Sequence, residues 1–448
     1  MKPDLSQVTE QLLDAARKAG ADSADAIAVA GESLTIEIRS GDLENAGRAE
    51  SVDIGLRVLV GNQQACVSAS DAREQTFGEM AERAVAMAKD APVDPFCGLA
   101  DPSDLATAWD VSGLDMEDPG PAPGPKVLEA AAREAEAAAL SVEGISKMDG
   151  AAANWGKSRL HIAATNGFSG GYGRTSHSVH AVAICGDGAN MERDYAFEAR
   201  MHWADMPSPS EIGRLAAERT IARAGASKPP TGAWPVIYDE RVSSGLIGHL
   251  VQAVSGSSVA RGSSWLKDSL GEAVLPSRLD LTEDPARPKV AGSKPFDAEG
   301  LLAVKRSVVA DGILQGWTLD LATSRELGMK STASAARSTG APPSPAAGNL
   351  TLTQGDKSHA ELMAEMGTGL LITSLMGASI NPTTGDYSRG ASGFWVENGE
   401  IVRPVNECTI AGNLREMLKS LTPANDARPH LSRVVPSLLV EGLVIAGN

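Results

Sequence analysis

The segment from Gly385 to Ile401 constrains the fold more than any other part of the chain. Its second half contains Asn398-Gly399 between an apolar run that ends at Val396 and a second apolar pair that begins at Ile401. Asn-Gly supplies the two consecutive residues with positive φ that a two-residue hairpin turn requires. The sequence therefore predicts a β-hairpin in the C-terminal part of the chain.

The first half of the same segment is rich in glycine and carries charged and hydroxyl side chains. We expect a constrained loop there, formed by Gly385, Asp386, Ser388, Arg389 and Gly390. Two interpretations are open: Asp386 and Arg389 pair and fix the turn, or the loop holds the main chain of a bound peptide. A nucleophile-like cluster is a third reading, but no histidine lies nearby in the sequence.

The charge of the chain argues against a nucleic-acid partner. The 448 residues include 57 acidic and 40 basic side chains, so the formal net charge is −17, and no long basic run occurs. Phosphate backbones are bound through clustered lysine and arginine. The start of the chain lacks the pattern of a secretory signal, and no apolar run approaches the roughly 18 residues of a membrane span. With four scattered cysteines, these features predict a cytoplasmic protein without membrane contact.

The first half of the chain alternates helix and strand patterns. Helices are predicted at residues 4–19, 71–90, 126–140 and 208–224, and strands at 34–38, 52–60, 159–163 and 176–184. Ser208 and Glu211 have the spacing of a capping box, as do Asp71 and Glu74. These elements predict an N-terminal α/β domain over residues 1–226, with a split into two subdomains near 100–125 as an alternative. No internal sequence repeat is evident.

The composition changes after the proline-rich join at residues 227–235. Beyond it, one helix is predicted at 240–254, and short β-branched runs separated by glycine and proline dominate. Residues 338–348 contain three prolines and are interpreted as an exposed loop. The sequence thus predicts a mainly β C-terminal domain over residues 235–448 and an α+β fold for the whole chain.

Seven fragments follow one another along the chain: RSGDLE at 39–44, GLRV at 55–58, ATNGF at 164–168, FDAEG at 296–300, LDLATSRELG at 319–328, the segment 385–401, and TIAGN at 409–413. In this order they resemble the PmbA/TldD family, the modulators of DNA gyrase, and in particular its PmbA (TldE) branch. The resemblance implies a PmbA/TldD-like fold and a cytoplasmic two-subunit metalloprotease. It also implies that the TldD subunit carries zinc, whereas the PmbA-like subunit usually carries none.

In the zinc-bearing branch a helix carries His-Glu-x-x-x-His, where the histidines bind Zn²⁺ and the glutamate acts on metal-bound water. When the motif is placed by counting back from Gly256, it falls on Ile247, Gly248 and Gln252. Isoleucine cannot bind zinc, glycine cannot act as a base, and glutamine is a poor ligand. A shift of one residue would bring His249 into the motif, but one histidine does not make a site.

The family's third zinc ligand is a cysteine near the C-terminus, and no cysteine follows Cys408. We therefore expect no catalytic residue, no metal and no cofactor in this chain, with zinc in the partner subunit.

Other groups that could carry chemistry have structural alternatives. His177 and His180 lie three residues apart on a predicted strand, so they point to opposite faces and cannot share a metal. Asp297 and Glu299 could form a same-face carboxylate pair suited to acid–base work. Cys408 lies on a predicted strand, and nothing in the sequence indicates a lowered pKa.

Three functions follow from these observations. The first is a PmbA/TldE-like, non-catalytic subunit that pairs with a TldD-like zinc-bearing subunit and acts on peptides; in isolation it can be a monomer or form a homodimer. The second is an independent hydrolase that uses Asp297 and Glu299 or Ser388. The third is a regulatory or binding protein without a role in proteolysis.

Overall fold

The computed structural model describes residues 4–447. Its N-terminal part consists of two units with the same order of elements, a helix, three strands and a helix. The first unit contains α1 (Leu5–Lys18), β1 (Ser23–Arg39), β2 (Asp42–Val60), β3 (Gln63–Ala69) and α2 (Glu74–Asp90). The second contains α3 (Pro125–Leu140), β4 (Ile145–Ala164), β5 (Ser169–Cys185), β6 (Glu192–Arg200) and α4 (Pro209–Ala222). The repeat lies in the topology, although the sequence shows none.

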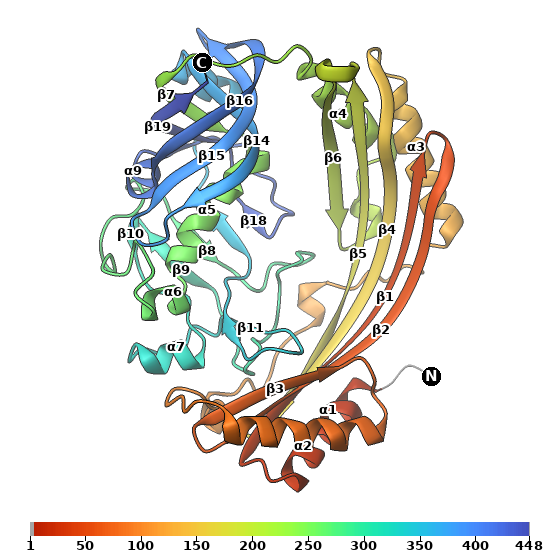
Figure 1. The fold of residues 1–448 in the computed structure, drawn as a ribbon, viewed down its shortest axis with the longest axis vertical. Coiled ribbons are helices and arrows are strands. Elements are labelled where there is room, and N and C mark those ends of the chain that lie inside the picture. Colours follow the sequence, from red (N-terminus) through yellow and green to blue (C-terminus); the bar gives the residue numbers. More distant parts are fainter. Residues whose placement is uncertain (1–3, 448) are drawn as a thin grey trace.

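The two units share one antiparallel sheet with the strand order β3-β2-β1-β4-β5-β6. Along β1, Ala24 and Ala28 pack under α1 and α2, whereas Ile36 and Ile38 pack under α3. Side chains two residues apart lie on the same face of a strand, so both helix pairs cover one face of the sheet at its two ends. Figure 1 shows the long strands curving from α1 and α2 to α3 and α4.

The predicted elements of this region are confirmed in kind but differ in extent. The capping box at Ser208 and Glu211 is present, with Pro209 at the start of α4. The expected box at Asp71 is wrong: α2 begins at Glu74 after Arg73, and the Asp71 carboxylate binds Arg73 and the hydroxyl of Thr76 instead. The strands are much longer than expected because they continue through polar and small residues, as β2 does over its exposed first half.

The C-terminal part begins with β7 (Gly232–Tyr238), α5 (Glu240–Ala253) and α6 (Gly256–Ala260). Short elements follow: β8 (Leu281–Glu283), β9 (Arg306–Ala310), β10 (Ile313–Leu314), α7 (Leu321–Glu326), β11 (Ala335–Ala336), β12 (Ser344–Pro345), β13 (Leu350–Leu352) and α8 (His359–Met366). The chain ends with β14 (Gly369–Ile380), β15 (Asp386–Glu397), β16 (Glu400–Asn413), α9 (Leu414–Lys419), β17 (Thr422–Pro423), β18 (Arg433–Val434) and β19 (Leu438–Ala446).

Five strands of this part form a closed ring. β7 pairs with β14 and β19, β14 with β15, β15 with β16, and β16 with β19. The predicted hairpin is confirmed, because Asn398 and Gly399 have φ of 53° and 82° and join β15 to β16. With helices and strands in both parts, the chain has the α+β fold that the sequence predicts. In residues 4–447, no helix is long and apolar enough to cross a membrane.

The C-terminal part docks on the face of the sheet that the helices leave uncovered. Phe168 and Phe296 pack with their ring centroids 4.9 Å apart, and Trp109 lies 5.0 Å from Phe296. A Cβ on Gly55 would overlap the backbone of Thr339, so the two parts approach closely there. The expectation of a wholly exposed loop at 338–348 is therefore wrong, since this segment contains β12 and part of it contacts the sheet.

Candidate functional site: a cleft between the two parts of the chain

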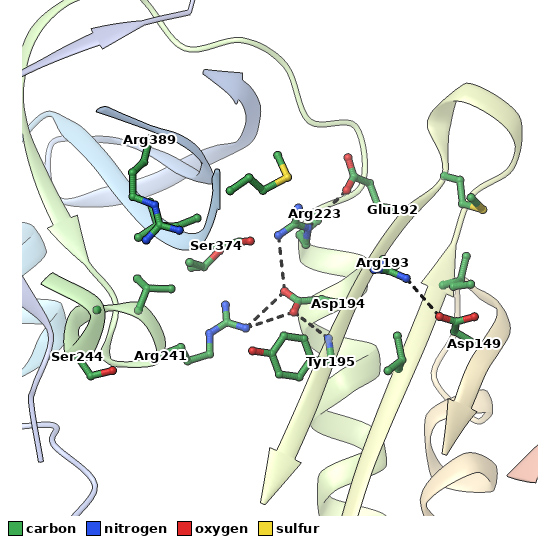
Figure 2. Close-up of a pocket in the computed structure, with 18 residues that line it drawn as sticks. Asp149, Glu192, Arg193, Asp194, Tyr195, Arg223, Arg241, Ser244, Ser374 and Arg389 are labelled. Atoms are coloured by element: carbon green, nitrogen blue, oxygen red, sulfur yellow. Dashed lines mark hydrogen bonds and ion pairs between the residues drawn. The ribbon is translucent and has the colours of Figure 1, made fainter. Parts of the chain in front are cut away.

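A cleft of about 740 Å³ lies between the N-terminal sheet and the C-terminal ring. One wall comes from β5, β6 and Met191 before β6. It combines the apolar residues Val182, Ile184 and Met191 and the ring of Tyr195 with the charged residues Glu192, Arg193 and Asp194. The other wall comes from α5, β14 and β15 and carries arginine and hydroxyl side chains (Figure 2). The volume falls within the roughly 300–1,000 Å³ typical of ligand sites.

Three of the four arginines that line the cleft are paired with acidic residues. Arg241 of α5 lies 3.4 Å from Asp194 of β6, so this ion pair crosses the cleft. Arg223 contacts Asp194 at 3.8 Å and Glu192 at 3.4 Å. Arg193 lies 3.3 Å from Asp149.

The fourth arginine, Arg389, has no acidic partner within residues 4–447. Its Nε donates a hydrogen bond to the carbonyl oxygen of Gly377 at 2.7 Å. Residues 386–390 belong to strand β15 rather than to the expected loop, so Asp386 and Arg389 point to opposite faces and do not pair. Asp386 instead accepts hydrogen bonds from the Thr384 hydroxyl at 2.6 Å and from Asn413. These two bonds lower the pKa of Asp386.

Strand β14 presents an open edge at the cleft. It pairs with β7 only from Leu370 to Ile372, and no strand of the described chain continues that pairing. The register against β15 shifts between Ile372 and Ser374, which leaves Thr373 unpaired in a bulge. Bulges redirect side chains, and here both Thr373 and Ser374 line the cleft.

The helix α5 presents a different set of residues to the cleft from the one placed by sequence. Ile247 is fully buried in the core, Gly248 lies beside Arg433, and Gln252 is exposed. None of the three is among the described residues that line the cleft, whereas Ser244 and Gly245 are.

His249 lies one turn beyond these two residues, with its ring 5.7 Å from that of Tyr387. Burial lowers the pKa of His249, and the positive charge of Arg389 lowers it further.

Comparison with protein families separates the chain into three matched regions. Residues 24–88 match domain 1 of the PmbA/TldA metallopeptidases, residues 118–224 match their central domain, and residues 231–447 match their C-terminal domain. The chain is also 36% identical to the metalloprotease PmbA of Escherichia coli O157:H7 over 93% of this chain and 90% of that protein. The chain belongs to the PmbA/TldD family.

Other members of the PmbA/TldD family give the same result. A PmbA homologue from Haemophilus influenzae is 35% identical over 99% of this chain and 96% of its own length. A crystal structure from Bacteroides thetaiotaomicron, of a candidate modulator of DNA gyrase, superimposes with a TM-score of 0.91 at 26% identity, covering 99% of this chain and 98% of that one. The structure of TldE from Thermococcus kodakarensis shares the fold, with a TM-score of 0.85, 19% identity and coverage of 98% and 99%.

The family name implies a metal, and the residues at this cleft do not fit one. Zn²⁺ needs three or four nitrogen, sulfur or carboxylate ligands around one point. Among residues 4–447, no three histidine, cysteine, aspartate or glutamate side chains gather in that way. The α5 wall offers Ser244 and Gly245, and the arginines of the lining would repel a cation.

Asp297 and Glu299 lie away from the cleft, buried between the two parts of the PmbA/TldD fold. Asp297 accepts hydrogen bonds from the backbone N–H groups of Glu299, Leu301 and Ala335, and Glu299 accepts one from that of Leu321. Burial raises the pKa of both carboxyl groups, and the neighbouring Asp297 raises the pKa of Glu299 further. Both carboxyl groups therefore stabilise the local backbone by accepting hydrogen bonds from its N–H groups.

A buried ion network adjoins this pair and was not identified in the sequence. Asp25 of β1 accepts two hydrogen bonds from Arg57 of β2, at 2.8 and 2.5 Å, and a third from Arg337 of the C-terminal part. Burial opposes ionisation of Asp25, but Arg337 and Arg57 outweigh it, so the pKa of Asp25 lies below its ordinary value. Arg57 also acts electrostatically on Glu299.

The remaining candidates are dispersed. His177 and His180 point to opposite faces of β5, as predicted; His177 is buried with its Nε2 3.0 Å from Asp118. Burial lowers the pKa of His177 despite that carboxylate. Burial raises the pKa of Cys408 to about 11, so its thiol stays protonated at neutral pH.

Proposed function

We propose that this chain is the non-catalytic PmbA/TldE-like subunit of a cytoplasmic TldD/TldE-type metalloprotease that acts on peptides, with zinc held by a TldD-like partner. The observation that carries the proposal is the residue set that α5 presents to the cleft. A catalytic zinc helix must point its ligands into the space that substrate enters. Here that turn carries Ser244 and Gly245.

The cleft also indicates a better register for the zinc motif. The sequence alone placed the three motif positions on Ile247, Gly248 and Gln252. If the motif must face the cleft, each position moves three residues toward the N-terminus, to Ser244, Gly245 and His249. Serine stands at the first histidine position and glycine at the glutamate position. Only His249 retains a ligand type, and it is half-buried against an aromatic ring beside an arginine.

The other wall supports a role in holding an extended peptide. Beyond Ile372 the edge of β14 exposes main-chain groups without a strand partner in the described structure. An extended peptide can pair with such an edge, because main-chain hydrogen bonds do not depend on the peptide's sequence. The apolar residues on the wall of β5 and β6 would then contact the peptide side chains.

An independent hydrolase has less support. The carboxyl groups of Asp297 and Glu299 are buried and accept backbone hydrogen bonds, so they cannot reach a substrate in the cleft. Ser388 lies on β15 and is outside the cleft lining in the described residues. Cys408 is a buried thiol.

The test is reconstitution. The chain and a TldD-like subunit with an intact His-Glu-x-x-x-His helix are purified separately and together, and peptide hydrolysis is measured with and without a chelator. We expect hydrolysis only from the pair, loss of activity on chelation, and zinc in the partner alone by elemental analysis. The isolated chain is expected to form a homodimer. Chelator-insensitive hydrolysis by this chain alone, or one tightly held zinc per chain, would overturn the proposal.

A further inference from the structure

The positive charge of Arg389 points to a more specific ligand. Building on the proposed function, we propose that Arg389, Thr373 and Ser374 bind the C-terminal carboxylate of a peptide whose last side chains contact the apolar residues Val182 and Ile184 of β5. The site would thus select a free peptide C-terminus rather than an internal segment.

The first argument is charge. The lining contains four arginines against three carboxylates, Asp149, Glu192 and Asp194. Each of these carboxylates already faces an arginine other than Arg389. Arg389 is therefore the one arginine of the cleft lining without an acidic partner among the described residues. An anion that enters the cleft would supply the missing partner.

The second argument is geometry. The hydrogen bond from Nε of Arg389 to Gly377 fixes the plane of the guanidinium group. Both terminal nitrogens then remain available, and they form the parallel pair of donors that binds the two oxygens of a carboxylate. Figure 2 shows Arg389 directed to the same space as Ser374 and Arg241.

The third argument is an unsatisfied hydroxyl. Thr373 is 8% exposed, and its Oγ1 is shielded from solvent with no hydrogen-bond partner in residues 4–447. A buried hydroxyl without a partner costs about 1–3 kcal/mol. Thr373 and Ser374 both line the cleft, so a ligand bound there can supply the missing partner. A bound carboxylate would satisfy this donor and pair Arg389 at once.

The wall opposite distinguishes a peptide from a small anion. Val182, Ile184, Met191 and Tyr195 offer apolar surface within the same cleft, which inorganic anions do not use. A peptide that places its carboxylate on Arg389 can bury its last side chains against this wall, while its main chain runs along the open edge of β14.

The experiment uses the full chain and three fluorescently labelled hexapeptides based on one sequence with apolar last residues. Two peptides keep this sequence, one with a free C-terminal carboxylate and one with a C-terminal amide. In the third, also an amide, glutamate replaces the last apolar residue. Fluorescence anisotropy gives the Kd of each. We expect the free acid to bind about tenfold or more tightly than the plain amide, with the glutamate amide close to the plain amide.

Two variants locate the effect. Arg389→Gln is expected to remove the preference for the free acid, whereas Arg193→Gln, which removes an equal charge that is already paired with Asp149, is expected to retain it. Far-UV circular dichroism checks folding. If Arg389→Gln does not fold, Thr373→Val, which keeps the shape of the side chain, is expected to reduce the preference by about threefold or more.

The binding measurements test the carboxylate site separately from the proposed function. Equal binding of acid and amide refutes the carboxylate site and leaves peptide binding, and with it the proposed function, intact. An equal advantage for the glutamate amide refutes selection of the C-terminus. Retention of the preference in Arg389→Gln refutes the assignment to this arginine. Selective binding of the acid, without zinc-dependent hydrolysis by the reconstituted pair, supports the site and refutes the proposed function.

Discussion

Replacement of Asp25 by alanine should uncouple the two parts of the chain. Asp25 is 3% exposed and is the carboxylate partner of both Arg57 and Arg337. Without the Asp25 carboxylate, the guanidinium groups of Arg57 and Arg337 stay buried and lose this acidic partner. Breaking one buried ion pair from one side costs about 3–5 kcal/mol, so we expect a loss of at least about 3 kcal/mol in the free energy of unfolding. Because Arg337 comes from the C-terminal part, the loss should appear as early separation of the two parts.

The assay is urea unfolding followed by tryptophan fluorescence and by far-UV circular dichroism. Trp109 lies 5.0 Å from Phe296 at the docking surface, so its environment is sensitive to separation of the two parts. The control is Glu50→Ala, which removes a carboxylate from an exposed pair with Arg48 at 2.7 Å; exposed pairs contribute about 0–1 kcal/mol. The reasoning is refuted if Asp25→Ala costs no more than Glu50→Ala.

Three further predictions concern titration, the cleft and zinc. Burial and the neighbouring Asp297 raise the pKa of Glu299. The contribution of Glu299 to stability is therefore complete below the unfolded pKa of about 4.3 and is lost as pH rises through the folded pKa. Glu299→Gln should flatten the decrease of the urea midpoint over this pH range, and an unchanged slope would contradict the assignment. Arg389→Ala should reduce peptide hydrolysis by the reconstituted pair about tenfold, and Arg48→Ala should leave it unchanged; equal effects would remove any special role of Arg389. The double variant Ser244→His with Gly245→Glu should bind Zn²⁺ at least about tenfold more tightly than the natural chain, because it adds an imidazole and a carboxylate to His249 on adjacent turns of α5. Calorimetry showing no gain would reject the revised register.

The sequence predicted correctly the features that depend on neighbouring residues, such as a helix cap and a tight turn. The capping box at Ser208 and the Asn398-Gly399 turn depend on residues within four positions of each other, and both are present. The long strands were underestimated because β1 and β4 alternate core residues with small and polar ones that strand propensity disfavours. Their partners along the sheet, such as Ala26 opposite Ala163, are more than a hundred residues apart and leave no local signal.

Sequence patterns did not predict the cleft, because its walls come from segments that are far apart in the sequence. Its walls combine β6 near Asp194 with β15 near Arg389, and only the docking of the two parts brings them together. The glycine-rich composition around Arg389 suggested a loop, but the glycines allow close strand packing: a Cβ on Gly393 would overlap the backbone of Leu371 on β14. Of the five residues predicted to form that loop, Arg389 lines the cleft, and residues 386–390 form strand β15 instead of a loop.

The two ends of the docking surface differ in what holds them. At one end, Asp25 binds Arg57 and Arg337 through short hydrogen bonds in a fully buried setting. At the cleft, Arg241 reaches Asp194 only at 3.4 Å, and this carboxylate is shared with Arg223. Asp194 is itself buried, and Arg428 adds ion pairs at 2.9 Å with Glu198 of β6 and with Glu240 of α5. Largely buried ion pairs therefore join the two parts at both ends of the docking surface, and together with the network around Asp25 they fix the two walls of the cleft relative to each other.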